Sequence, residues 1–308
     1  RLVALIMVSA IGLVPSLAFA WLSAPDLGLT QVTVEVVTIV LLLLALHWLP
    51  QHSPREPRRR RTLGRAAIAL AAGGGMAALT YAVLTRPFQS LSEFYLANSV
   101  PGGGGTNVVN VILVDFRGYD TFGEIIVLAI AALGIAAMMA RPLSERRAAD
   151  QDGRPWASEP HPMMLSVLTS LLLPLALMVA VFIFMRGHNL PGGGFVAGLV
   201  TGIALILLYI ANGIGWAGAR MHVSFTPVIG AGVFIAGLTG LASWFFGKPF
   251  LTSAHGHPHL PVLGDLPLAS AMAFDLGVYL TVVGVVMLVL SSLGKATASS
   301  PAEIEKEV

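Results

Sequence analysis

The chain has 308 residues, of which 56% are hydrophobic and only 11% charged, and its formal net charge is +2. A soluble domain carries about 25% charged residues, so this composition excludes an ordinary water-soluble protein and a nucleic-acid binder. The absence of cysteine excludes disulfides, iron–sulfur ligation and cysteine nucleophiles.

Apolar runs of about 20 residues, the length that a membrane helix needs, recur along the chain. They predict an all-α integral membrane protein with about eight transmembrane helices. The predicted spans are residues 2–22, 29–49, 66–85, 121–140, 163–185, 193–213, 226–246 and 271–293. The first run could be a signal peptide, but the second follows within a few residues, which favours a membrane helix. A start at Arg1 rather than Met suggests a segment of a longer protein.

The distribution of basic residues predicts the orientation of these helices. The loop at 50–65 and the segment 141–162 are rich in arginine, so we place both in the cytoplasm. Helix alternation then puts both termini there too. The few basic residues left outside are Arg86, Arg117, Arg186 and Lys248.

The segment 141–162 is the one long polar break between apolar runs, and its prolines and glycine discourage a continuous helix. We predict a cytoplasmic linker there, between two modules of four helices each, residues 1–140 and 163–294. The polar tail, 295–308, is predicted to be disordered.

Glu35 lies inside the second apolar run. An ionised carboxylate in lipid costs a few kcal/mol or more, and such groups usually face a protein interior or a wet cavity. Two interpretations follow: an ion-path residue, or an acid that pairs with a cation of a neighbouring subunit.

Asp120 and Glu124 are four residues apart at the start of the fourth run, so they share one helix face. The predicted topology places them in the same leaflet as Glu35. These three carboxylates are the predicted ion path, for a cation or for a proton held by a desolvated acid. Helix capping is the alternative for Asp120. The secondary candidates are Asp26, Asp115, Arg117, expected to be a local counter-ion, and Asp275, for which capping is again the simpler explanation.

Other polar motifs carry weaker signals. The glycine runs at 101–105 and 191–194 lack the Gly-Lys-Ser/Thr of a phosphate loop, so we interpret them as tight turns. His255, His257 and His259 alternate as transition-metal ligands could, although a solvated loop is the simpler interpretation. Residues 107–119 fit either an interfacial helix or a membrane-inserted one. No cofactor motif is visible.

Three stretches resemble one known family. "SAPDLGLTQVTVEVVTIVLLLLAL" (23–46) and "VPGGGGTNVVNVILVDFRGYDTFGE" (100–124) resemble the C-terminal part of the large A subunit of the multisubunit Na⁺/H⁺ antiporters, the Mrp, Mnh, Sha or Pha family. "FMRGHNLPGGGFVAGLV" (184–200) resembles the start of the B subunit. The order suggests an A–B fusion.

The resemblance implies exchange of Na⁺ or K⁺ for H⁺ across a bacterial plasma membrane, in a complex with further subunits. It also implicates Glu35, Asp120 and Glu124 in antiport. The B-like module offers no membrane-embedded carboxylate of similar depth, so we expect it to serve as a scaffold. Two other functions stay open: a purely structural role in assembly, or an accessory role in a redox-driven ion pump similar to hydrogenases or complex I.

Overall fold

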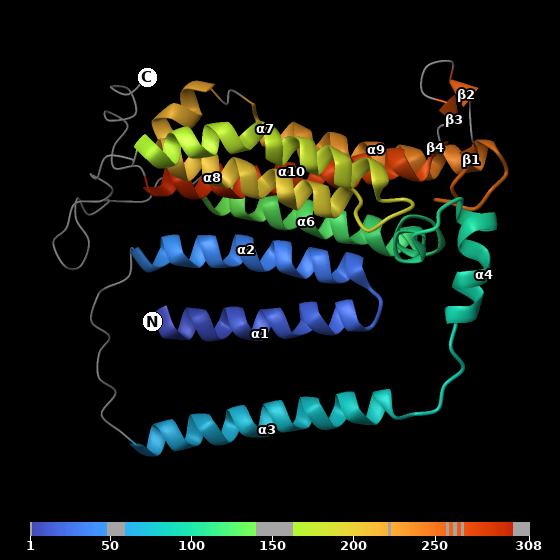
Figure 1. The fold of residues 1–308 in the computed structure, drawn as a ribbon. Helices are drawn as coiled ribbons and strands as arrows, with labels where there is room; N and C mark the ends of the chain where they lie inside the picture. The colour runs from blue at the N-terminus through green and yellow to red at the C-terminus, as the bar shows by residue number, and fades with distance from the viewer. Residues whose placement is uncertain are drawn as a thin grey trace. The chain divides into compact units, whose positions relative to one another are not determined.

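The computed structural model consists almost entirely of helices (Figure 1). It describes residues 2–47, 59–139, 163–220, 223–256, 259–260, 264–265 and 268–297. The helices are α1 (Leu2–Trp21), α2 (Pro25–His47), α3 (Arg59–Leu84), α4 (Ser92–Gly103), α5 (Val108–Val111), the π-helix η1 (Ile112–Phe116), α6 (Gly118–Met139), α7 (Met163–Arg186), α8 (Gly194–Arg220), α9 (Phe225–Phe245) and α10 (Ala271–Thr297).

Four two-residue strands lie between α9 and α10. They are β1 (His255–Gly256), β2 (His259–Leu260), β3 (Gly264–Asp265) and β4 (Leu268–Ala269), and β1 pairs with β4 while β2 pairs with β3. All other regular secondary structure in the described chain is helical. This confirms the predicted all-α class. The predicted linker, most of the loop at 50–65 and most of the tail lie outside the described residues.

Six helices are long and apolar enough to cross a membrane, counted over the described part of the chain. They are Thr62–Leu84, Gly118–Met139, Met163–Arg186, Gly194–Gly213, Phe225–Phe245 and Ala271–Ser292, and they match the third to eighth predicted spans. The first two predicted spans form α1 and α2. However, the apolar part of α1, Leu5–Trp21, is shorter than the six candidate spans, and α2 is not among the six. The protein is therefore a multi-pass membrane protein with six candidate spans.

The chain divides into two compact units. One is Leu49–Phe94, which contains α3, and the other combines Arg1–Trp48 with Tyr95–Val308. Every α3 side chain whose burial is described is exposed, so its apolar surface is not buried within its unit. The second unit, the main unit, contains the remaining long helices.

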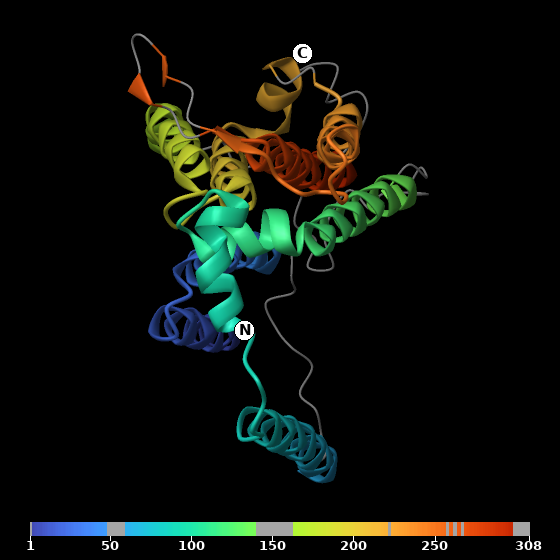
Figure 2. The ribbon, with the colours of Figure 1, turned by 90° about the vertical axis from the view of Figure 1, so that its right-hand side faces the viewer.

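In the main unit α10 is the central helix. It packs against α6, α8 and α9 and lies between them in Figures 1 and 2. Phe274 and Val278 of α10 are buried in a core that also contains Ile125 of α6. Glycines let α9 and α10 approach closely, since a Cβ on Gly277 would lie 2.6 Å from the carbonyl oxygen of Gly232.

The helices of the main unit alternate in direction, so every second connection lies at the same end, on the right in Figure 1. These are the connections α1–α2, α7–α8 and α9–α10 and the segment that leads into α6. We call this region the loop end; its described residues are 22–26, 103–118, 187–194, 246–256, 259–260, 264–265 and 268–275. Hydrogen bonds cross it, for example from Gly192 to Asp26 and from Ser253 to Asp115. The predicted alternation is thus seen in the main unit, while the side of the membrane that the loop end faces stays a prediction.

The segment α5–η1 runs crosswise to α6 rather than extending it (Figures 1 and 2). Val111 and Val114 are buried. Residues 107–119, for which the sequence allowed either an interfacial or a membrane-inserted helix, therefore form a short helix that packs across the loop end and then turns into α6.

Candidate functional site

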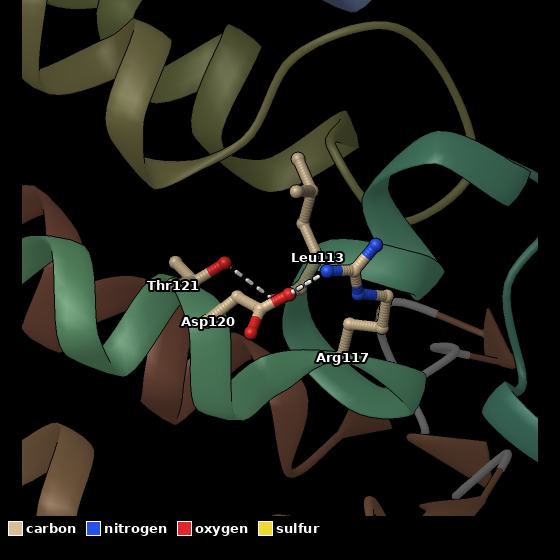
Figure 3. A network of polar contacts seen from close by, with 4 residues as sticks. All are labelled: Leu113, Arg117, Asp120 and Thr121. Carbon is tan, nitrogen blue, oxygen red and sulfur yellow. Dashed lines mark hydrogen bonds and ion pairs between the residues drawn. The ribbon is translucent and has the colours of Figure 1, made fainter.

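Asp120 and Glu124 lie in the first two turns of α6, and both are exposed within this chain. Asp120 forms an ion pair with Arg117 (Figure 3), the contact expected of a local counter-ion. Beside this pair, Thr121 Oγ1 donates a hydrogen bond to the Leu113 carbonyl at 2.7 Å and ties α6 to η1. Because α6 begins at Gly118, Asp120 lies in its first turn rather than at the N-cap.

Glu35 is half-buried on α2 and faces α1. Its carboxylate lies against the backbone of Gly12, where an added Cβ would be 2.8 Å from Oε1. α2 packs on α1 and α8, whereas α6 packs on η1, α9 and α10. These main contacts do not bring Glu35 beside Glu124, and their joint role in an ion path stays a prediction.

Two secondary candidates do meet, at the glycine-rich loop between α7 and α8. The backbone N–H of Gly192 donates to Asp26 Oδ1 at 2.6 Å. The N–H of Gly194 donates to Asp275 Oδ2 at 2.8 Å. Gly193, between them, has a φ of 110°, which side-chain-bearing residues rarely adopt. The sequence PGGG thus forms a tight turn, as predicted, and the turn binds two carboxylates.

Asp275 caps a helix, as predicted, but the helix is α8 rather than its own helix, α10. Since α10 begins at Ala271, Asp275 lies beyond its first turn. Its carboxylate instead accepts the N–H of Gly194, the first residue of α8. An acid at a helix N-terminus is stabilised by the partial positive charge there. Asp275 therefore fixes α10 to the start of α8.

Asp26 is the most buried predicted acid, with 5% of its surface exposed. Its Oδ2 has no hydrogen-bond partner among the described residues. Asn107 lies near it, but the Asn107 side-chain amide donates to the carbonyls of Gly187 and Leu190, at 3.0 and 3.1 Å.

The two glycine-rich loops interlock. Asn107 caps α5 by accepting the N–H of Asn110, while its amide binds the α7–α8 loop. Thr106 Oγ1 donates to the Asn189 carbonyl at 2.9 Å, and His188 Nε2 donates to the Gly103 carbonyl at 2.9 Å. Sequence reasoning missed these residues; their only signal was that each lies within or beside a glycine run.

His188 is buried in this interlock, with 8% of its surface exposed. Burial lowers the pKa of its imidazole below the ordinary value of 6.5, although the Gly103 carbonyl and the charge of Asp115 oppose the shift. His188 is therefore neutral at pH 7 and donates through Nε2.

Acidification is expected to loosen the interlock through His188. The unfolded imidazole binds a proton more readily than the folded one, so stability falls as pH drops below about 6.5 and is recovered above it. The melting temperature of the intact complex should fall more steeply at acid pH in wild type than in His188→Gln, whose amide stays neutral. Parallel curves would contradict this role.

Asp115 and the predicted histidine motif also belong to the loop end. Ser253 Oγ donates to Asp115 Oδ2 at 2.6 Å, so Asp115 holds the α9–α10 connection. His255 is exposed and lies against Gly104, while His257 lies outside the described residues. Among the residues described, no group of three His, Cys, Asp or Glu side chains could hold a metal ion.

Three family models match the chain, one after another along its length. Residues 164–288 match the "Domain related to MnhB subunit of Na+/H+ antiporter". Residues 58–153 match MbhE, the E subunit of MBH, and residues 1–51 match MbhD, its D subunit. A probable K(+)/H(+) antiporter A/B subunit of Rhizobium meliloti is 42% identical over 98% of this chain, which spans 33% of that protein.

Two further relatives agree. The B subunit of the Na(+)/H(+) antiporter of Bacillus subtilis is 43% identical over 43% of this chain, and 93% of that protein is covered. The solved Mrp complex from Dietzia sp. DQ12-45-1b contains a chain that matches with a TM-score of 0.80 and 36% identity, over 98% of this chain and 33% of that one. The chain therefore belongs to the Mrp/Mnh family of multisubunit cation/proton antiporters, and nearly all of it is homologous to one third of a fused A/B subunit.

Proposed function

We propose that the chain is a membrane subunit of a multisubunit antiporter that exchanges Na⁺ or K⁺ for H⁺, and that Glu35, Asp120 and Glu124 contribute to its ion path. The function is transport rather than catalysis. The strongest support for this proposal is the presence of acids in apolar helices. Glu35 is half-buried against α1, and Glu124 lies within the candidate span Gly118–Met139.

In this mechanism a carboxylate alternates between a proton and a cation. An acid in lipid is costly unless it faces protein or water. Glu124 is exposed within this chain, so a neighbouring subunit of the complex supplies the rest of its surroundings. The remaining antiporter subunits are thus the proposed partners, together with Na⁺ or K⁺, H⁺ and the bilayer.

Neutralising these acids is expected to stop antiport without preventing assembly. In the full complex, Glu35→Gln and Glu124→Gln should each reduce Na⁺- or K⁺-dependent proton flux in vesicles by about tenfold or more, a loss of at least about 1.4 kcal/mol. Glu93→Gln, on the exposed start of α4, is the matched control. Full flux in both membrane variants would refute the ion path.

An assembly role is the second candidate, favoured by the Arg117–Asp120 ion pair at the exposed start of α6. A surface pair contributes little stability on its own, about 0–1 kcal/mol, but could orient a neighbouring subunit. If this role is the true one, Asp120→Arg should lose complex on a native gel, and the complex that remains should keep its specific activity.

The membrane arrangement extends the same proposal. It has eight spans, with α1 and α2 crossing as well, and the cytoplasmic linker 141–162 joins the modules 1–140 and 163–294. Both termini of the segment, including the tail 295–308, face the cytoplasm of a bacterial cell. Because the loop at 50–65 and the linker share their excess of arginine, the loop end would face outward.

A further inference from the structure

The α7–α8 loop binds two acids from helices that are distant in sequence. Asp26 of α2 accepts the Gly192 N–H, and Asp275 of α10 accepts the Gly194 N–H. The two acids are close enough for their charges to interact. Asp26 Oδ2 is buried and has no hydrogen-bond partner among the described residues, although the Asn107 side chain lies near Asp26. One oxygen of this pair is therefore open to a proton.

Within the described part of the chain, no cation neutralises the pair directly, and neither acid forms an ion pair there. Arg186 acts on Asp26 electrostatically, but its Nε donates to the Pro191 carbonyl at 2.8 Å and its guanidinium lies 5.0 Å from the Phe182 ring centroid. The N-terminus of α8 adds a partial charge of about +0.5. Asn107 beside Asp26 and Asn110 beside Asp275 act as uncharged hydrogen-bond donors, so they too leave the two negative charges without a full counter-charge.

We propose that Asp26 and Asp275 form one proton-binding site at the start of α8, in which the pair holds a single proton. A buried carboxylate without partners is costly, and a second carboxylate nearby disfavours ionisation of both. The proton adds to Asp26 Oδ2 and leaves the bond from Gly192 to Oδ1 intact. The site goes beyond the proposed ion path, and proton binding there does not depend on Glu35 or Glu124.

A proton fits this position better than a metal cation. A hard cation such as Ca²⁺ takes six or more oxygen ligands, whereas the described residues offer no cluster of three acidic or imidazole ligands. The N–H groups of Gly192 and Gly194 also point at the acids. They occupy Asp26 Oδ1 and Asp275 Oδ2, so few carboxylate oxygens remain for a metal ion, whereas a single proton needs only Asp26 Oδ2.

Arg186 is the cation that acts on Asp26. Three further ionisable side chains lie on the elements that meet at the pair: His188 of the α7–α8 loop, Asp115 of η1 and Tyr279 of α10. His188 is neutral because burial lowers its pKa. Asp115 is bound by Ser253, and the Tyr279 hydroxyl pairs with Thr201 Oγ1 at 3.1 Å. His188, Asp115 and Tyr279 are thus engaged with other groups, which leaves Asp26 and Asp275 to hold the proton.

Infrared difference spectroscopy on the purified intact complex, between acid and alkaline pH, tests the site. Wild type should show a protonated-carboxyl C=O band that disappears on alkalinisation. Asp26→Asn and Asp275→Asn should each remove it, because the proton belongs to the pair. The matched control is Glu93→Gln, which neutralises an exposed acid of α4 outside both the pair and the proposed ion path, and it should keep the band.

A band that persists unchanged in both Asn variants would overturn the proposal, as would the absence of any buried carboxyl band in wild type. If the Asn variants fail to assemble, Asp26→Glu keeps the acid and should move the band, and an unmoved band again refutes the site. Normal flux in Glu35→Gln and Glu124→Gln would refute only the ion path, so the two failures are distinguishable.

Discussion

Gly277→Ala is expected to weaken the packing of α9 on α10 and lower the melting temperature of the complex. An added Cβ would lie 2.6 Å from the Gly232 carbonyl oxygen and 2.8 Å from the Ala236 backbone nitrogen. Both are backbone atoms, so relief requires the two helices to move apart. Overpacking of this kind costs about 1–3 kcal/mol. The effect should be large because α10 is the central helix of the main unit.

The control is Gly230→Ala on α9, where no atom lies within 4 Å of the added Cβ. Alanine is the better helix former by about 1 kcal/mol, so this variant should melt at the same temperature as wild type or slightly higher. Equal losses in both variants, measured on the detergent-solubilised complex, would show that glycine is needed for a reason other than the close contact.

Much of the fold follows from the sequence because hydrophobic length is a strong signal. The helices α6, α7, α9 and α10 begin and end within a few residues of their predicted limits. α8 instead continues to Arg220, past its predicted end at Gly213, where the backbone φ is 81°. The weaker prediction was the count of spans. α2 carries Asp26 and Glu35. Such polar side chains lower the mean hydropathy of a helix, so that a membrane-spanning helix is harder to distinguish from a helix buried in protein.

The candidate site was harder to predict, because its contacts join residues that are distant in the chain. Asp26 and Gly192 are 166 positions apart, and no periodicity connects them. Asp275 looked like a cap of its own helix, yet it caps α8. Glu35 and Glu124 were selected by their cost in lipid, a local argument that says nothing about whether α2 and α6 meet.

Asn107→Ala is expected to open the interlock between the two glycine-rich loops. The change removes the N-cap of α5, which costs about 0.5–2 kcal/mol. It also removes the donor to the carbonyl of Gly187, a buried residue, and leaving a buried acceptor unmet costs about 1–3 kcal/mol. Hydrogen exchange in residues 187–193 of the intact complex should rise, and the melting temperature should fall.

Asn107→Asp separates the two causes. The carboxylate can still accept the Asn110 N–H and cap α5, but it cannot donate to Gly187 or Leu190, and it places a negative charge near Asp26. If the interlock matters, this variant should lose as much protection in 187–193 as the alanine variant, or more. Wild-type exchange in Asn107→Asp would mean that capping alone explains Asn107, and that the two loops are held together by other contacts.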